Sequence, residues 1–224
     1  MQKQLIKWYQ ENKRDFPWRK DQDPYHIWIS EIMLQQTTTE TVIPYYNRFL
    51  KNFPNVEALA SASLEEVYKM WEGLGYYRRA KHIHESAQII LEKYQGVFPY
   101  EYDAILSLKG IGEYTAGAIS SIAYGKQVPA VDGNVLRIIS RYYLIKENIA
   151  ETKVQKKIYQ IVQELILNHD ASAFNQGMMD LGATICKPVH PLCLECPIQK
   201  GCLAFKKKQM DVLPVSYTHL TLPT

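Results

Sequence analysis

Four cysteines near the C-terminal end are the first residues whose type and spacing could do chemistry. They are Cys186, Cys193, Cys196 and Cys202, and the chain contains no others. Four thiols within seventeen residues favour a bound metal over the disulfide framework of a secreted protein. The spacing is compatible with a four-thiolate zinc site and with an iron–sulfur cluster. The cysteines alone therefore predict a metal centre and leave both kinds open.

A carboxyl group near the N-terminal end is the second candidate. Glu31 lies in a helical pattern, and its neighbours at i−4, i−3 and i+3 are Ile27, Trp28 and Leu34. These apolar side chains would desolvate the carboxyl group and favour its protonated form, as a general acid requires. The pattern is equally compatible with a glutamate at the helix edge that pairs with an arginine.

A glycine-rich turn in the middle of the chain is the third candidate. Gly110 and Gly112 flank Ile111 between two helical patterns, where the backbone needs a positive φ or must let another molecule approach. A helix that begins near Tyr114 would present free N–H groups and a partial positive charge, which suit a phosphate. Asp132 follows about one helix length later. Taken singly, a Gly-x-Gly turn is common, and an aspartate before a helix is usually an N-cap.

The elements that must position these groups are all helices. Asp23-Pro24 predicts an N-cap and first helical residue, and Ser63 with Glu66 predicts a capping box. Asp103 is expected to cap a short helix before the glycine turn, and Gly125 to end the helix after it. Helical spacing predicts segments around residues 5–9, 24–36, 42–50, 63–71, 76–95, 114–124, 133–144, 152–167 and 172–186. No convincing strand alternation occurs, so the predicted fold class is all-α.

Composition narrows the class of protein. The chain of 224 residues carries a formal net charge of +3, which permits an anionic partner without requiring one. No apolar run approaches the length of a membrane span, and the N-terminus is amphipathic rather than signal-like. We therefore expect a soluble, intracellular monomer that makes no membrane contact. Sixteen tyrosines and four tryptophans exceed the needs of a core, so some could stack on bases.

Three segments, in this order, resemble the DNA base-excision glycosylases related to endonuclease III. They are residues 30–37 (Ser-Glu-Ile-Met-Leu-Gln-Gln-Thr), residues 108–118 with the Gly-Ile-Gly turn, and residues 131–134 (Val-Asp-Gly-Asn). Within that superfamily, which shares a helix-hairpin-helix, the chain is most similar to the MutY-type adenine glycosylases. The resemblance spans roughly residues 1–215.

The resemblance implies two helical domains that bind DNA between them. Residues 23–131 would form a six-helix barrel domain that contains the helix-hairpin-helix. Residues 1–22 and 132–210 would form an iron–sulfur cluster domain, because the cysteine spacing matches that of the family's [4Fe-4S] cluster. Residues 211–224 would be the start of a linker, and the last nine residues a foreign tail. The family's C-terminal module, which reads 8-oxoguanine on the opposite strand, is missing from this sequence.

The resemblance also assigns catalytic roles. Glu31 would protonate the departing adenine, and Asp132 would stabilise the cationic sugar, which is the two-carboxylate logic of glycoside hydrolysis. Asn134 matches a polar residue of the family near this site, although a first-turn amide of a helix has the same appearance. Tyr114 stands where strand-cutting relatives carry a Schiff-base lysine, and a phenol cannot form an imine. The sequence therefore predicts a monofunctional glycosylase.

Further residues would contact DNA or the extruded base. Gln36 and Tyr76 would fill the gap that base flipping leaves, although a tyrosine after a glycine turn is often only a packing residue at a helix start. The remaining matches at the DNA surface are Gln35, Leu74, Lys109, Gly110 and Gly112. Lys109 could also support weak lyase activity or be merely solvated. Gln176, Arg19 and Trp18 would line the base pocket, although a glutamine on a helix surface has the same appearance.

The predicted function is removal of adenine mispaired with 8-oxoguanine or guanine in double-stranded DNA, within the cytoplasm and its nucleoid. Three alternatives stay open. A bifunctional glycosylase for oxidised pyrimidines would share the fold, and Tyr114 argues against it. A thymine-mismatch glycosylase can also carry tyrosine at that position, and Glu31 argues against it. A non-enzymatic nucleic-acid-binding module would lose only affinity when Glu31 or Asp132 is replaced.

Overall fold

The computed structural model of the chain describes residues 1–216, and within this range the regular elements are α-helices and short 3-10 helices. These residues fall into two compact units. One is Asp15–Tyr124, and the other combines Met1–Arg14 with the chain from Gly125 onward. No helix among the described residues is long and apolar enough to cross a membrane. The all-α prediction is confirmed. The predicted foreign tail lies outside the described residues except for Ser216.

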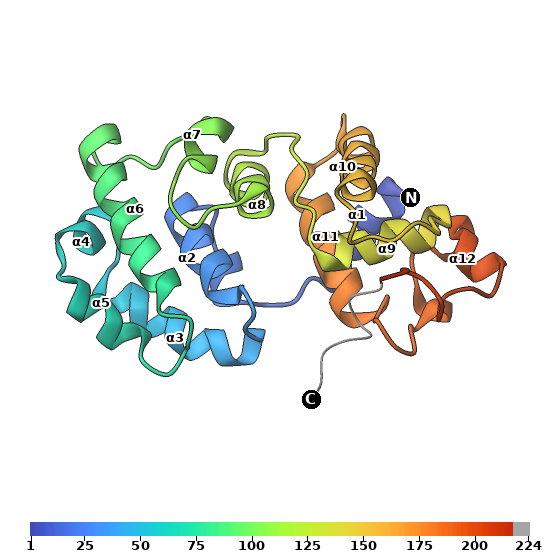
Figure 1. Ribbon diagram of the computed structural model, residues 1–224, viewed down its shortest axis with the longest axis horizontal. Coiled ribbons are helices and arrows are strands. Elements are labelled where there is room, and N and C mark those ends of the chain that lie inside the picture. The colour runs from blue at the N-terminus through green and yellow to red at the C-terminus, as the bar shows by residue number, and fades with distance from the viewer. Residues whose placement is uncertain (217–224) are drawn as a thin grey trace. The chain divides into compact units, whose positions relative to one another are not determined.

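The unit Asp15–Tyr124 contains seven α-helices and one 3-10 helix. They are η1 (Pro17–Arg19), α2 (Pro24–Leu34), α3 (Thr39–Asn52), α4 (Val56–Ser61), α5 (Leu64–Trp71), α6 (Arg78–Tyr94), α7 (Tyr102–Leu106) and α8 (Glu113–Tyr124). Helix α2 contacts α3, α6 and α8 (Figure 1). It is apolar on nearly every side and eight of its eleven residues are buried, which is why it lies inside the unit.

Local signals set several helix ends as predicted. The Asp23 side chain accepts a hydrogen bond from the N–H of Tyr25, and Ser63 and Glu66 form the predicted capping box. Gly125 follows α8 with φ +65°. The prediction that Asp103 caps α7 is wrong, because the N-cap is Glu101 and the helix begins two residues earlier than predicted, at Tyr102. Asp103 instead lies in the first turn, where its carboxylate faces the positive end of the helix dipole.

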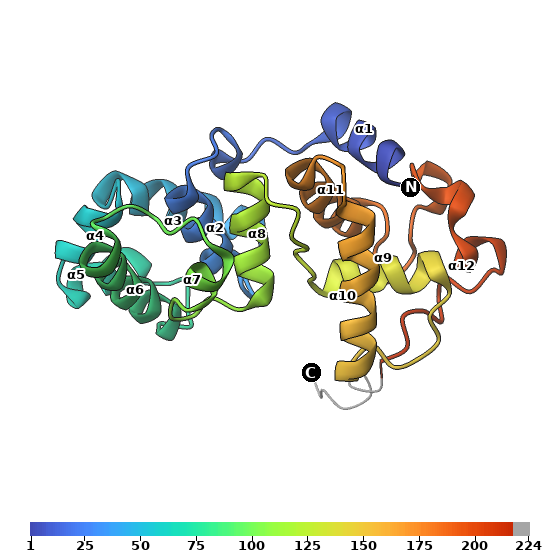
Figure 2. The same cartoon turned by 90° about the horizontal axis from the view of Figure 1, so that it is seen from above.

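The second unit contains α1 (Gln2–Asn12), α9 (Gly133–Tyr143), α10 (Thr152–Ile166), α11 (Ala171–Thr184), η2 (Cys193–Glu195), η3 (Gln199–Gly201) and α12 (Leu203–Lys206). Helix α9 contacts α10, α11 and α12, and α1 contacts α11 (Figure 2). A Cβ at Gly177 of α11 would lie 3.2 Å from the Cβ of Tyr9 and 3.3 Å from Cγ of Leu5. The absence of a side chain at Gly177 therefore lets α1 pack closely on α11.

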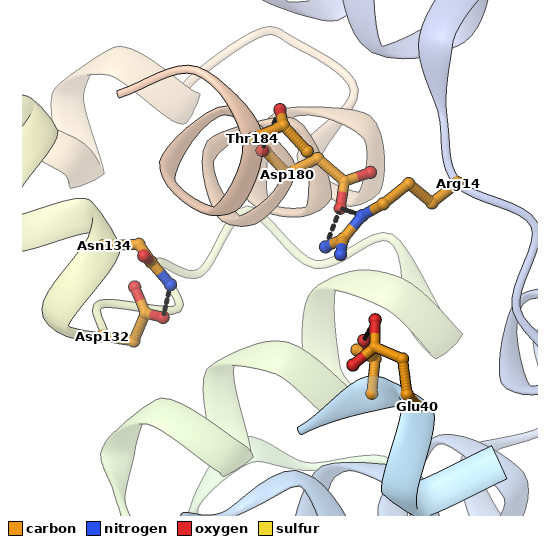
Figure 3. Close-up of polar contacts among 7 residues, drawn as sticks. Arg14, Glu40, Asp132, Asn134, Asp180 and Thr184 are labelled. Atoms are coloured by element: carbon orange, nitrogen blue, oxygen red, sulfur yellow. Dashed lines mark hydrogen bonds and ion pairs between the residues drawn. The ribbon is translucent and has the colours of Figure 1, made fainter. Parts of the chain in front are cut away.

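A buried ion pair fixes the end of the N-terminal segment to the same helix. Arg14 donates from Nε (2.9 Å) and Nη2 (2.6 Å) to Oδ1 of Asp180, as Figure 3 shows. The Asp180 side chain is 1% exposed, and its main-chain carbonyl accepts from the Thr184 hydroxyl at 2.8 Å. Because a buried carboxylate needs a partner, this pair holds Met1–Arg14 in its unit.

The unit boundaries differ from the predicted ones at residues 22/23 and 131/132. Residues 15–22 belong with Asp15–Tyr124 because Phe16 and Trp18 are buried in that unit's core. Residues 125–131 belong with the other unit. There the Asn175 side chain donates to the carbonyl of Val128 at 2.9 Å and accepts from the N–H of Ala130 at 3.3 Å.

The predicted start of a linker at residue 211 is also corrected. Leu213 is 3% exposed, and its carbonyl accepts a hydrogen bond from Nε of Arg141 at 2.8 Å. The N–H of Ile149 donates to the carbonyl of Val215 at 3.0 Å. Residues up to 215 therefore pack on the unit that contains the cysteines, because Leu213 is buried there and the main chain around it is hydrogen-bonded to Arg141 and Ile149.

Candidate active site and metal centre

Glu31 lies in the third turn of α2 and is 7% exposed. Its predicted apolar neighbours Ile27 and Trp28 are 2% and 0% exposed. The helix that carries it is fixed at its start by Asp23 and Pro24 and is buried along its length. The burial that the sequence predicts for Glu31 is confirmed. A carboxyl group placed in this way is a candidate proton donor.

Asp132 is the N-cap of α9, and both of its oxygens are hydrogen-bonded. Oδ1 accepts from the N–H of Val135 at 2.9 Å, and Oδ2 accepts from Nδ2 of Asn134 at 2.7 Å (Figure 3). Oδ1 of Asn134 in turn accepts from Nη2 of Arg137 at 2.7 Å. Asp132 is thus the ordinary N-cap that the pattern suggested, and the same bonds fix its carboxylate in one orientation. Asn134 orients Asp132 directly.

No sequence pattern singles out Arg137, yet its side chain links several segments of this unit by hydrogen bonds. It is 8% exposed and also donates from Nη2 to the carbonyl of Gly182 (2.8 Å) and from Nε to that of Cys186 (2.7 Å). Burial lowers the pKa of Arg137. A Cβ at Gly182 would lie 2.5 Å from the Cβ of Asn134, so only glycine allows this approach. A hydrogen-bonded path therefore runs from Asp132 to the main chain of the first cysteine.

Gln176, a predicted base-pocket residue, lies in the same unit on α11. It is 9% exposed, and its Nε2 donates to the Ser172 hydroxyl at 3.0 Å. The preceding residue, Asn175, holds the segment before Asp132 through Val128 and Ala130. Helix α11 therefore carries Gln176 next to Asn175, whose side chain holds the segment that leads to Asp132.

The glycine turn resolves the two possibilities that the sequence left open. Gly110 has φ +78°, and a Cβ there would lie 2.9 Å from Nδ1 of His82 in α6. A Cβ at Gly112 would meet nothing within 4 Å, which leaves its backbone open to another molecule. Lys109 lies 3.0 Å from Glu85 of α6, and its carbonyl accepts from the Ser86 hydroxyl at 3.2 Å. The turn is therefore attached to α6 and open at Gly112.

Tyr114 is the second residue of α8 and is half-buried directly after this turn. Its phenol stands where the resemblance implies a Schiff-base lysine in strand-cutting relatives. Lys109, the nearest lysine in sequence, is paired with Glu85 across 3.0 Å.

The four predicted DNA contacts outside the turn lie in two loops of one unit. Gln36 follows α2 with φ +58°, and Tyr76 precedes α6 with φ +49° and is 61% exposed. Gln35 is half-buried, and its carbonyl accepts from Arg79. Leu74 is 6% exposed and belongs to the core, so its side chain supports the loop from inside rather than facing outward.

Trp18 and Arg19 lie in η1 and differ in environment. Trp18 is 7% exposed, stacks on Phe16 at 4.9 Å between ring centroids and meets the Tyr46 ring edge-on at 5.5 Å. Its contacts are those of a core residue, which argues against the predicted place at a pocket mouth. The Arg19 guanidinium lies over the Phe16 ring at 5.2 Å. The Phe-Pro-Trp-Arg motif therefore anchors the chain before α2.

The four cysteines of the second unit line one cavity, which is partly open to solvent. No group of three or more His, Cys, Asp or Glu side chains within residues 1–216 is arranged to hold a single metal ion. Burial raises the pKa of the Cys196 thiol to about 12, so a metal would have to displace its proton. All four thiols therefore line the same cavity.

Arg141 of α9 lies beside this cavity and is 2% exposed. Its Nη1 donates to Sγ of Cys186 (3.4 Å) and to the carbonyl of Lys187 (2.6 Å), and its Nη2 to that of Pro188 (2.9 Å). The carbonyl of Arg141 accepts from Sγ of Cys202 at 3.6 Å. Arg141 therefore places a positive charge against the thiols and holds the loop that carries them.

The chain belongs to the family described as HhH-GPD superfamily base excision DNA repair protein, which matches residues 29–164. The adenine DNA glycosylase of Buchnera aphidicola subsp. Acyrthosiphon pisum (strain APS) is 45% identical over 220 residues, covering 98% of this chain and 63% of the relative. That of Mus musculus is 42% identical over 218 residues, covering 93% of this chain and 42% of the relative. The chain therefore spans only part of the length of these relatives.

A solved structure supports the fold independently. The structure of a thermostable thymine-DNA glycosylase matches with a TM-score of 0.83 and 32% sequence identity, covering 92% of this chain and 94% of the other. The all-helical glycosylase fold predicted from the sequence is confirmed. The known relatives act, by their names, on adenine and on thymine, so the family alone does not choose the base.

Proposed function

We propose that this chain is a monofunctional DNA glycosylase that hydrolyses the N-glycosidic bond of adenine mispaired with 8-oxoguanine or guanine. The observation that carries the proposal is Glu31, a carboxyl group 7% exposed in the apolar helix α2. An acid shielded from water suits protonation of a departing base. Similarity to adenine DNA glycosylases over 98% and 93% of this chain supports adenine as that base. The enzyme would act as a monomer on double-stranded DNA, in the cytoplasm with the nucleoid.

In the proposed reaction the bond between adenine and C1′ of its sugar breaks, and the electron pair leaves with the base. Glu31 supplies the proton that neutralises the departing adenine. Asp132, oriented by Asn134 and the N–H of Val135, stabilises the positive charge that develops on the sugar. Water then adds to C1′ and returns a proton to Glu31. The products are free adenine and an abasic site.

Tyr114 supports the absence of lyase activity in the proposal. A strand-cutting glycosylase needs an amine that forms an imine with the sugar, and a phenol cannot do so. Lys109 is paired with Glu85 at 3.0 Å, and its main chain is tied to Ser86. We therefore assign Lys109 to the support of the hairpin.

The same proposal includes a [4Fe-4S] cluster held by Cys186, Cys193, Cys196 and Cys202. The residues fit such a group, because all four thiols line one cavity and thiolates are the usual ligands of iron–sulfur clusters. The Arg141 guanidinium would balance part of the charge of the thiolates. When bound, the cluster would supply iron–thiolate bonds that cross-link the segment from Cys186 to Cys202.

Thymine is the second candidate base, because the solved thymine-DNA glycosylase is 32% identical to this chain with a TM-score of 0.83. Glu31 favours adenine over thymine as the excised base. We expect thymine opposite guanine to be a poor substrate. A non-enzymatic binding module would excise neither base.

Single-turnover assays on labelled duplexes test the proposal. The duplexes carry adenine opposite 8-oxoguanine, adenine opposite guanine, thymine opposite guanine, or an oxidised pyrimidine, and each is read with and without hot alkali. We expect breaks only in the two adenine duplexes, and only after alkali. Breaks without alkali on the oxidised pyrimidine would show a lyase and contradict the role of Tyr114. Excision of thymine alone would replace adenine as the substrate.

A further inference from the structure

Two residues in separate loops of the unit Asp15–Tyr124 share an uncommon backbone conformation. Gln36, after α2, has φ +58°, and Tyr76, before α6, has φ +49°. Both side chains are exposed, and Tyr76 is 61% exposed. A residue other than glycine rarely adopts a positive φ, and it persists there only when its surroundings hold it. Other residues must therefore hold the backbone of these two loops in place.

Arg79 of α6 binds the first loop. Its Nη1 donates to the carbonyls of Ile32 (3.1 Å) and Met33 (2.9 Å) and to that of Gln35. Its Nη2 donates to the hydroxyl of Thr37 at 3.3 Å. These acceptors lie at the C-terminal end of α2, where carbonyls lack helical partners and the helix dipole favours a cation. The guanidinium therefore contacts the chain on both sides of Gln36.

The same guanidinium binds the second loop. Its Nη2 donates to the carbonyls of Leu74 and Gly75, each at 3.3 Å. The carbonyl of Gly75 also accepts from Nε1 of Trp71 at 3.0 Å. The Arg79 guanidinium lies over the rings of Trp71 and Tyr76, with Cζ 5.5 Å and 5.3 Å from the ring centroids. It thus contacts the chain just before Tyr76 and the Tyr76 ring itself.

The rest of the second loop is equally constrained. Gly73 has φ +93°, and a Cβ there would collide with the hydroxyl of Tyr45. Leu74 is 6% exposed in the core. These contacts leave the exposed ring of Tyr76 as the part of the loop that faces outward.

We propose that Arg79 is a positioning residue that fixes Gln36 and Tyr76 as one rigid pair for insertion into the duplex when the base is extruded. The inference rests on the proposed glycosylase function. Only a planar group with several donors can serve acceptors in both loops at once, so lysine could not replace it. Arg79 is 8% exposed and acts through the two loops.

The test compares Arg79→Lys with Arg48→Lys. Arg48 lies in the same unit, donates to the carbonyl of Met70 at 3.0 Å and lies over the Tyr45 ring at 4.7 Å, without a hydrogen bond to either loop. Both substitutions keep the charge, so general attraction to DNA is preserved. The readouts are circular dichroism and Tm, the Kd for an undamaged duplex, and the single-turnover rate of adenine excision opposite 8-oxoguanine.

We expect Arg79→Lys to lower the excision rate roughly 10–100-fold, the scale of a small misplacement of reacting groups. Its Kd for the undamaged duplex should stay within about twofold, as should both values for Arg48→Lys. An excision rate for Arg79→Lys equal to that of Arg48→Lys would overturn the inference. Absence of excision by the unchanged protein would instead refute the proposed function.

A double-mutant cycle separates positioning from general support. Tyr76→Ala should slow the unchanged protein more than it slows Arg79→Lys, because the arginine acts through the tyrosine. Rate reductions that multiply fully would show that Arg79 acts elsewhere. If Arg79→Lys does not fold, Thr37→Val replaces it in the cycle, since it removes one acceptor of the guanidinium and keeps the shape. A smaller effect of Tyr76→Ala in Thr37→Val than in the unchanged protein would support the inference. Rate reductions that multiply fully, or no effect of Thr37→Val on the rate, would refute it.

Discussion

Glu31 and Asp132 are two carboxyl groups that the fold treats in opposite ways. Glu31 is 7% exposed in a helix whose neighbouring side chains are apolar. Asp132 caps a helix, and its two oxygens accept hydrogen bonds from Val135 and Asn134. The first carboxyl group is shielded from water by its burial, and the second is held in place by two hydrogen-bond donors. The difference teaches that one fold can place the same chemical group either among apolar side chains or in a polar network.

The contrast also reflects how each group is built. Glu31 depends on packing, since α2 is buried along its length and contacts α3, α6 and α8. Asp132 depends on a polar network, in which Asn134 and Arg137 lead to the carbonyls of Gly182 and Cys186. Changes in packing should therefore affect the first group, and changes in hydrogen bonding the second.

The largest expected effect comes from removing the proton of the acid. Glu31→Gln keeps the size of the side chain and should lower adenine excision about 10²–10⁴-fold, the usual contribution of a general acid. Tm and the Kd for duplex DNA should change little. The matched control is Glu65→Gln on the exposed face of α5 in the same unit, which should keep full activity. Full excision by Glu31→Gln would contradict the acid role and favour a binding module.

Two substitutions of Asp132 separate its role as an N-cap from the role of its negative charge. Asparagine is as good an N-cap as aspartate, so Asp132→Asn should keep the stability of α9 while excision falls about 10²–10³-fold. Asp132→Ala loses the cap as well and should cost about 1 kcal/mol of unfolding free energy. Chemical denaturation and single-turnover rates measured on both variants make the comparison. Equal excision by Asp132→Asn and the unchanged protein would leave Asp132 with the cap role alone.

Gly182 allows the hydrogen-bonded network around Asp132 to be tested without changing a polar side chain. In Gly182→Ala the new Cβ would lie 2.5 Å from the Cβ of Asn134, so the packing of Asn134 against α11 must change, and with it the residue that is hydrogen-bonded to Asp132. We expect a loss of about 1–3 kcal/mol in unfolding free energy and a slower excision step. Gly133→Ala is the control, because its Cβ would meet nothing within 4 Å. A variant as stable and active as this control would show that the position of Asn134 is not critical.

Most of the fold could be predicted because its signals are local. Asp23-Pro24, the Ser63/Glu66 box and Gly125 each specify a helix end within a few residues. Helix α4 was missed, since its six residues are too few for a helical period, although Asn55 caps it.

The candidate site was predictable only in part. Glu31 and the cysteines stand out by pattern. Arg137 and Arg79 do not stand out, because their main hydrogen-bond partners are distant in sequence. The distant partners of Arg137 lie 45 to 49 residues away. Those of Arg79 lie 42 to 47 residues away. Gly182 is important only because Asn134 packs against it. Such roles depend on tertiary contacts, which local spacing does not encode.

Glu85 is a third carboxylate and should show the smallest effect. Its hydrogen bond and ion pair with Lys109 lower its pKa, so its contribution to stability is present above the unfolded-state pKa and is lost as pH falls through the folded value. Because Lys109 is exposed and Glu85 only half-buried, Glu85→Gln should change Tm at neutral pH by no more than about 2 °C, and less at high salt. Thermal unfolding at neutral and acidic pH checks this, with the unchanged protein and Glu85→Gln converging at low pH. A loss of stability as large as that of Gly182→Ala would mean that exposed pairing at the hairpin matters as much as the buried network around Asp132.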